Sequence, residues 1–418
     1  MKKIAALVLC VSAALAAGAQ LPVGMDPPFP PSLGGTMMPI RLPEEFPAAP
    51  DSLTPVFVNH IGRHGARFLS SEKKVGDLLS SLEAARTRGS LTRAGEEMAA
   101  LLQTVREKTD GRWGQLDSLG EAEQRGIASR LDAMLPGFFS QGSIIAISTF
   151  VPRAVASMYG FCHQLGSLNP DLQMTASSGR EYDSLLRFFD TDRRYADYIR
   201  HGGWRKTYDG YSAANVPVAP AIRLVGGGRP KEELQEITMR VYAVLQSLPA
   251  AGINAGISRF MTPEEYRACY LADNLKHALQ RTDTRFSDLP GKAAEGLLRE
   301  IIDSSEVIVS TAEARRLIRG VFRFAHAETL MPLFSLMGLP GCTVPQEATP
   351  QTLADYWNDS FVSPLGANLI LVFYAAPSGK AYVQALLNGR QIAPLPAAAS
   401  PIVPWTSLRD FWQKSMLP

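Results

Sequence analysis

The chain has 418 residues, of which 46% are hydrophobic and 20% are charged, and its formal net charge is +2. This composition is ordinary for a globular protein, and the length is enough for two or three lobes. The near-neutral charge gives no argument for a nucleic acid or an anionic membrane as a partner, so any basic site must be local.

The first residues have the pattern of a signal peptide over residues 1–19. Two lysines precede an apolar run over residues 4–17, which is too short for a good membrane span, and Ala17-Gly18-Ala19 fits a small-x-small cleavage site before Gln20. Cleavage removes two of the 42 Lys and Arg residues, which then equal the 40 Asp and Glu residues in number. No later stretch has about eighteen uninterrupted apolar residues. We therefore expect an exported protein without stable membrane insertion, located in the periplasm, in vesicles or outside the cell.

Three cysteines remain after such cleavage, namely Cys162, Cys269 and Cys342. They allow at most one intramolecular disulfide, and their spacing resembles no zinc site. We expect three mostly buried thiols.

The pattern of the chain changes three times. Residues 20–50 are rich in proline and glycine and read as an extended arm on the surface. Strand patterns followed by helical patterns occupy residues 51–165 and 306–418, whereas residues 166–305 hold helical runs with few strand patterns. We predict an α/β core from the two outer segments and a mainly helical insertion or cap domain from residues 166–305.

The motif Arg63-His64-Gly65-Ala66-Arg67 follows an apolar strand pattern over residues 55–59. Ligands of open α/β sheets bind where strands end. A neutral imidazole can attack phosphorus and form a covalent intermediate, and the planar guanidinium groups of Arg63 and Arg67 fit phosphate oxygens. The glycine lets the backbone approach a bound anion. The alternative is a strand end with solvated arginines, since short motifs are prone to false positives.

Two further strand patterns end in polar residues. The strand predicted at residues 143–149 precedes Arg153, and the strand predicted at residues 321–325 precedes His326-Ala327-Glu328. Because side chains two residues apart in an extended segment point the same way, His326 and Glu328 can face one site together. Taken alone, such an arginine is more often a surface residue and such a histidine is more often structural; next to the first motif, both become candidates for phosphate binding.

Residues 200–231 are basic and read as loop-rich, with six cationic side chains against the single acid Asp209: Arg200, Arg205, Lys206, Arg223, Arg229 and Lys231. This window either attracts a polyanion or is solvated surface. Its aromatic residues are also compatible with single-stranded nucleic acid, but a secreted protein without net charge argues against that partner. Arg180 and Arg187 lie just upstream and can contribute.

These features resemble the histidine acid phosphatase family, the clade-2 histidine phosphatases, and within it the multiple inositol polyphosphate phosphatases, which include secreted bacterial phytases. The resemblance extends over most of residues 55–395. It rests on the motif at residues 63–67, the Leu-x-x-x-Gly helix start near Gly120, Ser148-Thr149 with Arg153, His326-Ala327-Glu328-Thr329, and the late segments Pro364 to Tyr374 and Val383 to Pro394. It implies a mixed, largely parallel sheet flanked by helices.

By this resemblance, His64 is the nucleophile and Glu328 is the proton donor. Arg63, Arg67, Arg153 and His326 bind the phosphate that reacts, with His326 cationic and activity therefore best below neutral pH. Arg180, Arg187, Arg205 and Lys206 are weaker candidates for the other phosphates of the substrate. No metal ion or other cofactor is implied, because the arginines supply the charge that a metal would.

Two departures from the general family pattern stand out. Leu69 occupies a position where the pattern has proline, and Ala327 occupies that of the aspartate proton donor. The His-Ala-Glu form is the one that the inositol polyphosphate branch carries, so the donor role passes to Glu328. The different donor position puts expectations about the order of phosphate removal in doubt.

Other functions remain open at this point. A general acid phosphatase or a sugar-phosphate phosphatase is the nearest alternative. A phosphoglycerate mutase fits less well because of the predicted export and the long helical insertion. A secreted protein that binds phosphate esters without turnover is a different class, against which the complete set of nucleophile, cations and acid argues.

Overall fold

The computed structural model describes residues 33–396, 398 and 400–417. The predicted signal peptide and residues 20–32 of the predicted arm lie outside these residues. The rest of the arm begins with the short helix η2 (Gly35–Met37) and then follows the α/β lobe, where Phe46 is buried and the Ile40 N–H donates to Glu123 Oε1 at 3.0 Å.

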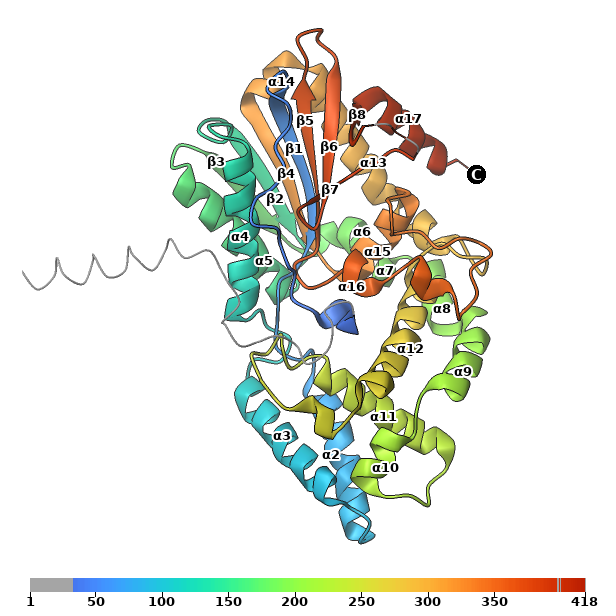
Figure 1. The fold of residues 1–418 in the computed structure, drawn as a ribbon. Coiled ribbons are helices and arrows are strands. Elements are labelled where there is room, and N and C mark those ends of the chain that lie inside the picture. The colour runs from blue at the N-terminus through green and yellow to red at the C-terminus, as the bar shows by residue number, and fades with distance from the viewer. Residues whose placement is uncertain (1–32, 397, 399, 418) are drawn as a thin grey trace, which may run out of the picture.

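An eight-stranded sheet forms the centre of the molecule (Figure 1). Its order is β3-β2-β4-β1-β5-β6-β7, with β8 paired to β6; β3, β2, β4 and β1 are mutually parallel, and the remaining pairings are antiparallel. The mixed, largely parallel sheet is thus confirmed. The bounds are β1 (Thr54–Arg63), β2 (Ser143–Ser148), β3 (Gln173–Ser178), β4 (Ile318–Ala325), β5 (Asn368–Ala375), β6 (Ala381–Leu387), β7 (Arg390–Ile392) and β8 (Ile402–Pro404).

Helices cover both faces of this sheet, and its central strands are therefore buried on both sides. On one face α4 (Ser118–Met134) and α5 (Pro152–Leu168) pack on alternate residues of the strands, such as Val58 and Phe322. On the other face pack α13 (Leu289–Ser310), α15 (Ala327–Leu336) and α17 (Trp405–Ser415), against residues such as Phe57 and Val321. Figure 1 shows α4 and α5 on the opposite side of the sheet from α13 and α17.

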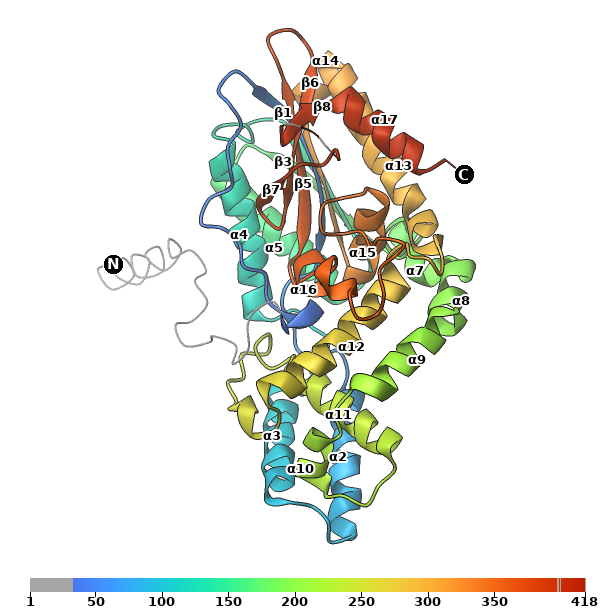
Figure 2. The ribbon, with the colours of Figure 1, turned by 45° about the vertical axis from the view of Figure 1, so that its right-hand side comes forward.

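A second, helical lobe lies beyond the ends of the central strands, in the lower half of Figures 1 and 2. Its core is a separate hydrophobic cluster formed by α2 (Glu72–Thr87), α3 (Arg93–Thr109), α10 (Ala219–Val225), α11 (Lys231–Leu245) and α12 (Pro263–Arg281). Long helix α12 runs beside α9 in both views. The remaining helices are η3 (Arg180–Tyr182), α6 (Asp183–Leu186), α7 (Phe188–Thr191), α8 (Arg193–His201), α9 (Trp204–Asn215), η4 (Ile257–Arg259), α14 (Ala312–Leu317), η5 (Leu353–Asp355) and α16 (Asp359–Val362).

The packing differs from the predicted division of the chain in three places. Helices α2 and α3 fall in the predicted core segment but pack in the helical lobe, whereas β3 and α13 fall in the predicted insertion but pack in the α/β lobe. The reason is that a local helical pattern does not specify which apolar surface will cover it.

Several local predictions are confirmed. Asn388 and Gly389 both have positive φ, 53° and 76°, in the tight turn from β6 to β7. Cys162, Cys269 and Cys342 are buried free thiols. None of the helices among the described residues has the length and apolarity needed to cross a membrane.

Strand β1 carries a buried histidine just before the sequence motif. His60 is 1% exposed, and its ring lies 5.2–5.6 Å from the rings of Phe161, Phe322 and Phe324, centroid to centroid. Neither ring nitrogen has a hydrogen-bond partner among the described residues. Burial, with a smaller contribution from Arg323, lowers the pKa of His60 to about 3.

This histidine makes the fold sensitive to acid. Between its lowered pKa and the ordinary value of 6.5, the unfolded chain binds a proton that the folded chain does not, so stability falls as pH falls. Between about pH 6.5 and 4.5, we predict that the free energy of unfolding falls by about 2 kcal/mol less in His60→Phe than in the wild-type protein. Urea unfolding at each pH measures this. His201→Gln, at an exposed histidine, should leave the pH dependence unchanged, and an unchanged slope in His60→Phe would contradict the prediction.

Candidate active site

The three predicted phosphate-binding segments meet because three parallel strands end at one edge of the sheet. Arg63, the last residue of β1, is in register with Ala325 at the end of β4, and Ser148 at the end of β2 is in register with Phe324. The loop of residues 64–67 leaves β1, His326 leaves β4, and Thr149 leaves β2. This is the carboxyl edge at which ligands of parallel sheets bind.

Backbone and helix contacts fix the loop of residues 64–67. The His64 N–H donates to Ala325 O at 3.1 Å, the Gly65 N–H donates to Ser157 Oγ at 3.1 Å, and the Ala66 N–H donates to Glu123 Oε2 at 2.6 Å. The first three backbone donors of the loop therefore have partners from β4, α5 and α4. Glu123 is a positioning residue that sequence reasoning missed.

The Leu-x-x-x-Gly helix start near Gly120 has a steric explanation. A Cβ on Gly65 would lie 2.4 Å from Gly120 O, and a Cβ on Gly120 would lie 2.1 Å from Ala66 O. Only glycine at both positions allows the first turn of α4 to approach the loop this closely. Asp117 caps that turn by accepting from the Gly120 N–H at 2.8 Å.

His64 is 2% exposed, and its Nδ1 lies 2.9 Å from Gly65 O. Because a carbonyl oxygen only accepts, Nδ1 must carry the proton in this hydrogen bond, and Nε2 keeps its lone pair. Burial, together with the charges of Arg63, Arg153 and Arg67, lowers the pKa of His64 well below its ordinary value. The ring is therefore neutral and available as a nucleophile, even in mild acid.

Three arginines surround this imidazole without an acidic partner. Arg63 and Arg67 are buried and Arg153 is partly buried; within the described part of the chain none of them forms an ion pair, and the Nε of each is buried without a hydrogen-bond partner. Burial lowers the pKa of Arg63 to about 10 and that of Arg67 to about 9. Concentrated, unbalanced positive charge of this kind binds a dianion such as a phosphate ester.

His326 lies next to His64, and Glu328 lies near His326 and Arg63. The rings of His64 and His326 are 5.6 Å apart, and His326 Nε2 lies 3.0 Å from Thr149 Oγ1. Burial lowers the pKa of His326 to about 3, since Glu328 only partly opposes burial and Arg153 adds to it. The prediction of a cationic His326 is therefore wrong for the free site, because sequence alone did not reveal how deeply this ring is buried.

The carboxyl group of Glu328 is ionised in the free site. Burial raises its pKa, but Arg281, His326 and Arg63 outweigh burial and lower the pKa to about 2. A bound phosphate dianion would offset the positive charge of Arg281 and Arg63 and so favour the protonated form of Glu328.

The four weaker candidates for binding the other phosphates form two pairs, Arg180 with Arg187 and Arg205 with Lys206. Arg187 lies close enough to lower the pKa of both Arg153 and His326, and Arg180 and Arg187 lie 4.0 and 4.8 Å from the centroid of the Phe150 ring. Arg205 and Lys206 are exposed on α9, and no contact joins them to the predicted catalytic residues.

The basic window at residues 200–231 is helical rather than loop-rich, so that prediction is wrong: α9 and α10 occupy most of it. Two of its arginines are also neutralised. Arg223 pairs with Glu265 at 2.9 Å, and Arg229 pairs with Glu233. The window is therefore not a continuous basic strip.

Three cations missed by sequence reasoning reach the site from the helical lobe. Lys74 on α2 is exposed, but desolvation beside the site and Arg67 lower its pKa, with Asp273 and Glu328 among its further charged neighbours. Lys276 on α12 lies near Lys74, with its Nζ 5.8 Å from the centroid of the Tyr208 ring. Arg281 ends α12, and its Nη1 is buried without a hydrogen-bond partner among the described residues. No linear motif joins α2 to α12, so only the packing of the lobe reveals this group.

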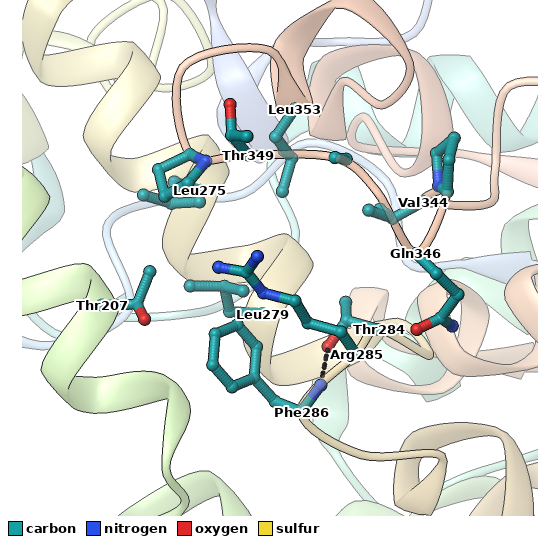
Figure 3. A pocket seen from close by; sticks show the side chains of 13 residues that line it. Thr207, Leu275, Leu279, Thr284, Arg285, Phe286, Val344, Gln346, Thr349 and Leu353 are labelled. Carbon is teal, nitrogen blue, oxygen red and sulfur yellow. Dashed lines mark hydrogen bonds between the residues drawn. The ribbon is translucent and has the colours of Figure 1, made fainter.

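A second pocket is too small to be an alternative substrate site. It lies between α9, α12 and the loop of residues 344–353, and Arg285 extends into it (Figure 3). Its volume is about 10 Å³, which is enough for about one water molecule.

Comparisons with known proteins agree with the resemblance drawn from the sequence. No family model matches the chain. Human multiple inositol polyphosphate phosphatase 1 is 24% identical over 431 residues, which cover 91% of this chain and 83% of that protein.

Solved structures share the fold. The multiple inositol polyphosphate phosphatase of Bifidobacterium longum in complex with inositol hexasulfate superposes with a TM-score of 0.75 at 17% identity, over 92% of this chain and 98% of its own. The phytase from D. castellii gives a TM-score of 0.70 at 15% identity, over 92% and 85%. The chain thus resembles, in sequence and in fold, the inositol polyphosphate phosphatases and phytases of the histidine acid phosphatase family.

Proposed function

We propose that this protein is a phosphomonoesterase that hydrolyses phytate and other inositol polyphosphates through a phosphohistidine intermediate. The observation that carries the proposal is the neutral His64 ring, with Nε2 free, among three guanidinium groups that lack acidic partners. The relatives support the substrate class, since the human protein is named for inositol polyphosphates and the Bifidobacterium longum protein was crystallised with inositol hexasulfate and with phosphate.

In the first step, Arg63, Arg67, Arg153 and His326 bind the phosphoryl group that reacts, and the arginines neutralise its oxygens. His64 Nε2 attacks phosphorus in line, the N–P bond forms and the ester P–O bond breaks. Glu328 gives its proton to the departing inositol alkoxide. The arginines supply the positive charge that the transferred group needs, so this step uses no metal ion.

In the second step, Glu328 takes a proton from water, and the water oxygen attacks phosphorus as the N–P bond breaks. Phosphate leaves, and Glu328 is again protonated. Because Glu328 must start protonated, and the ordinary pKa of a glutamate is about 4.3, activity is highest in acid. The expectation of an acidic optimum is kept, with Glu328 rather than His326 as its basis.

The other phosphates of the substrate bind to cations on the helical lobe and beside β2. Lys74, Lys276 and Arg281 lie on the helical-lobe side of the site, and Arg187 lies near Arg153 and His326. A small monoester has no groups to reach these cations, so they favour a polyphosphate.

The leaving group tests the proton donor. We predict that Glu328→Gln lowers kcat for phosphate release from phytate by about 10²- to 10⁴-fold, because an inositol alkoxide needs a proton to leave. Release from an aryl phosphate, whose leaving group is stable as an anion, should fall far less. Phosphate release from both substrates between pH 3 and 7 measures the contrast.

His64→Ala is the control for that experiment and should release phosphate from neither substrate. Equal slowing of both substrates by Glu328→Gln would exclude a proton-donor role. If the unmodified protein hydrolyses aryl and sugar phosphates but not phytate, it is a general histidine acid phosphatase, and the proposed substrate class is wrong.

Two double variants test the substrate-binding cations. We predict that Lys74→Ala/Lys276→Ala raises KM for phytate about tenfold or more and leaves KM for an aryl phosphate nearly unchanged, since charge-assisted hydrogen bonds to phosphate contribute at least about 1.5 kcal/mol. The matched variant is Arg205→Ala/Lys206→Ala at exposed positions, for which we expect a smaller rise. A larger rise in KM for phytate in Arg205→Ala/Lys206→Ala would instead indicate that α9 binds the other phosphates.

A further inference from the structure

A group of metal-ligating side chains lies at the junction of the two lobes, apart from the residues assigned to phosphoryl transfer. Asp273 and His277 are one helical turn apart on α12, and Asp359 begins α16. One ligand atom from each lies within 4.8 Å of the other two. The closest pair is His277 Nδ1 and Asp359 Oδ2, at 2.7 Å.

Unpartnered buried oxygens point at the same place. Asp359 is fully buried with Oδ1 unpartnered, and Tyr242 Oη and Gln246 Oε1, from side chains that are 1% and 8% exposed, also lack partners among the described residues. A Cβ built on Gly35 would lie 3.3 Å from Gln246 Oε1, 3.6 Å from Asp359 Oδ2 and 3.6 Å from Tyr242 Oη. The unpartnered Gln246 Oε1 and Tyr242 Oη therefore lie around one point beside Gly35 together with Asp359 Oδ2, the oxygen bonded to His277. A buried oxygen without a partner is costly unless something binds it.

The two carboxylates of this group have no direct cationic partner other than His277 among the described residues, although Lys74 lies near Asp273 and Arg63 lies near Asp359. Two carboxylates, one imidazole and an amide oxygen form a mixed oxygen and nitrogen ligand set, which suits Zn²⁺ or Mn²⁺ better than an all-oxygen ion such as Mg²⁺. Ligand atoms around a tetrahedral Zn²⁺ are about 3.5 Å apart, so side-chain movements of about 1 Å would bring the three ligand atoms to coordinating distance.

We propose that Asp273, His277 and Asp359 bind one divalent transition-metal ion, Zn²⁺ or Mn²⁺, with the buried oxygens of Gln246 and Tyr242 facing it. The ion would join α11, α12 and α16, and Gly35 of η2 packs against the same oxygens. It takes no part in phosphoryl transfer, so this proposal and the proposed function can fail independently.

The position links the ion to the phosphate-binding arginine. Arg63 Nη1 donates to Thr36 O at 2.5 Å and to Ser363 O at 2.7 Å. Thr36 follows Gly35 in η2, and the Ser363 N–H donates to Asp359 O at 2.9 Å. An ion that fixes Asp359 would therefore also fix the Ser363 carbonyl that orients Arg63, and Thr36 lies next to the same site through Gly35.

Metal binding by the whole protein tests the proposal without reference to turnover. Untagged protein is stripped with EDTA, freed of chelator, and dialysed to equilibrium against ZnCl₂ or MnCl₂ alone, and the bound metal is counted. We expect one ion per chain, with affinity at least tenfold weaker in Asp273→Asn and in His277→Gln, and a higher Tm for the loaded wild-type protein only.

The chain offers a matched control. His201 and Asp197 form a pair of the same spacing, with His201 Nδ1 2.9 Å from Asp197 Oδ1, but they are exposed and lack a third ligand. Asp197→Asn/His201→Gln should bind metal like the wild type.

Wild-type binding no stronger than that of Asp273→Asn would overturn the proposal and leave a pocket that holds only water. If both site variants fail to fold, X-ray absorption of the Zn²⁺-loaded wild-type protein is the deciding measurement. Nitrogen and oxygen ligands alone would support the site. A sulfur ligand at about 2.3 Å would assign the ion to a cysteine and overturn the proposal.

Discussion

Unbalanced positive charge at the end of β1 is the constraint on which the rest of this structure depends. Arg63, Arg67 and Arg153 face one another around His64 without a carboxylate to pair with, and such groups repel one another at low dielectric. The arrangement costs stability in the free protein. A bound phosphate dianion relieves the repulsion between the arginines. The free energy that this repulsion costs in the free protein is therefore recovered when the substrate or the transition state binds.

The fold orients these arginines with backbone carbonyl groups and not with direct ion pairs. Carbonyl groups of Thr36 and Ser363 orient Arg63, and the carbonyl of Phe68 accepts from Arg67 Nη1 at 2.9 Å. Glu123, the nearest buried acid on α4, accepts from two backbone N–H groups instead of an arginine. A carboxylate used in this way fixes the loop that carries His64 and leaves the guanidinium groups free for phosphate.

How far the sequence predicts this site depends on where each residue comes from. The residues at strand exits were predictable because parallel strands end together, so Arg63, His64, Arg153 and His326 needed only correct strand patterns. Lys74, Lys276 and Arg281 were not, since α2 and α12 are distant in the chain and meet only through the core of the helical lobe.

Charge states were also beyond the reach of the sequence. His326 was expected to be cationic, but its pKa depends on burial among Phe189, Thr149 and Arg153, which no local pattern reveals. The lobe in which individual helices pack was beyond the reach of the sequence for a related reason. Helices α2 and α13 have ordinary amphipathic patterns, and the surface that each covers is decided by the whole chain.

The most direct test of the account is to trap the phosphorylated protein and identify the atom that carries the phosphoryl group. Protein mixed with phytate is quenched in alkali after milliseconds, digested, and the phosphopeptide is examined by mass spectrometry and NMR. Because the Nδ1 proton of His64 is held by Gly65 O, we predict phosphorylation of His64 at Nε2. A phosphoryl group at Nδ1, on another residue, or absent during active turnover would contradict the central claim.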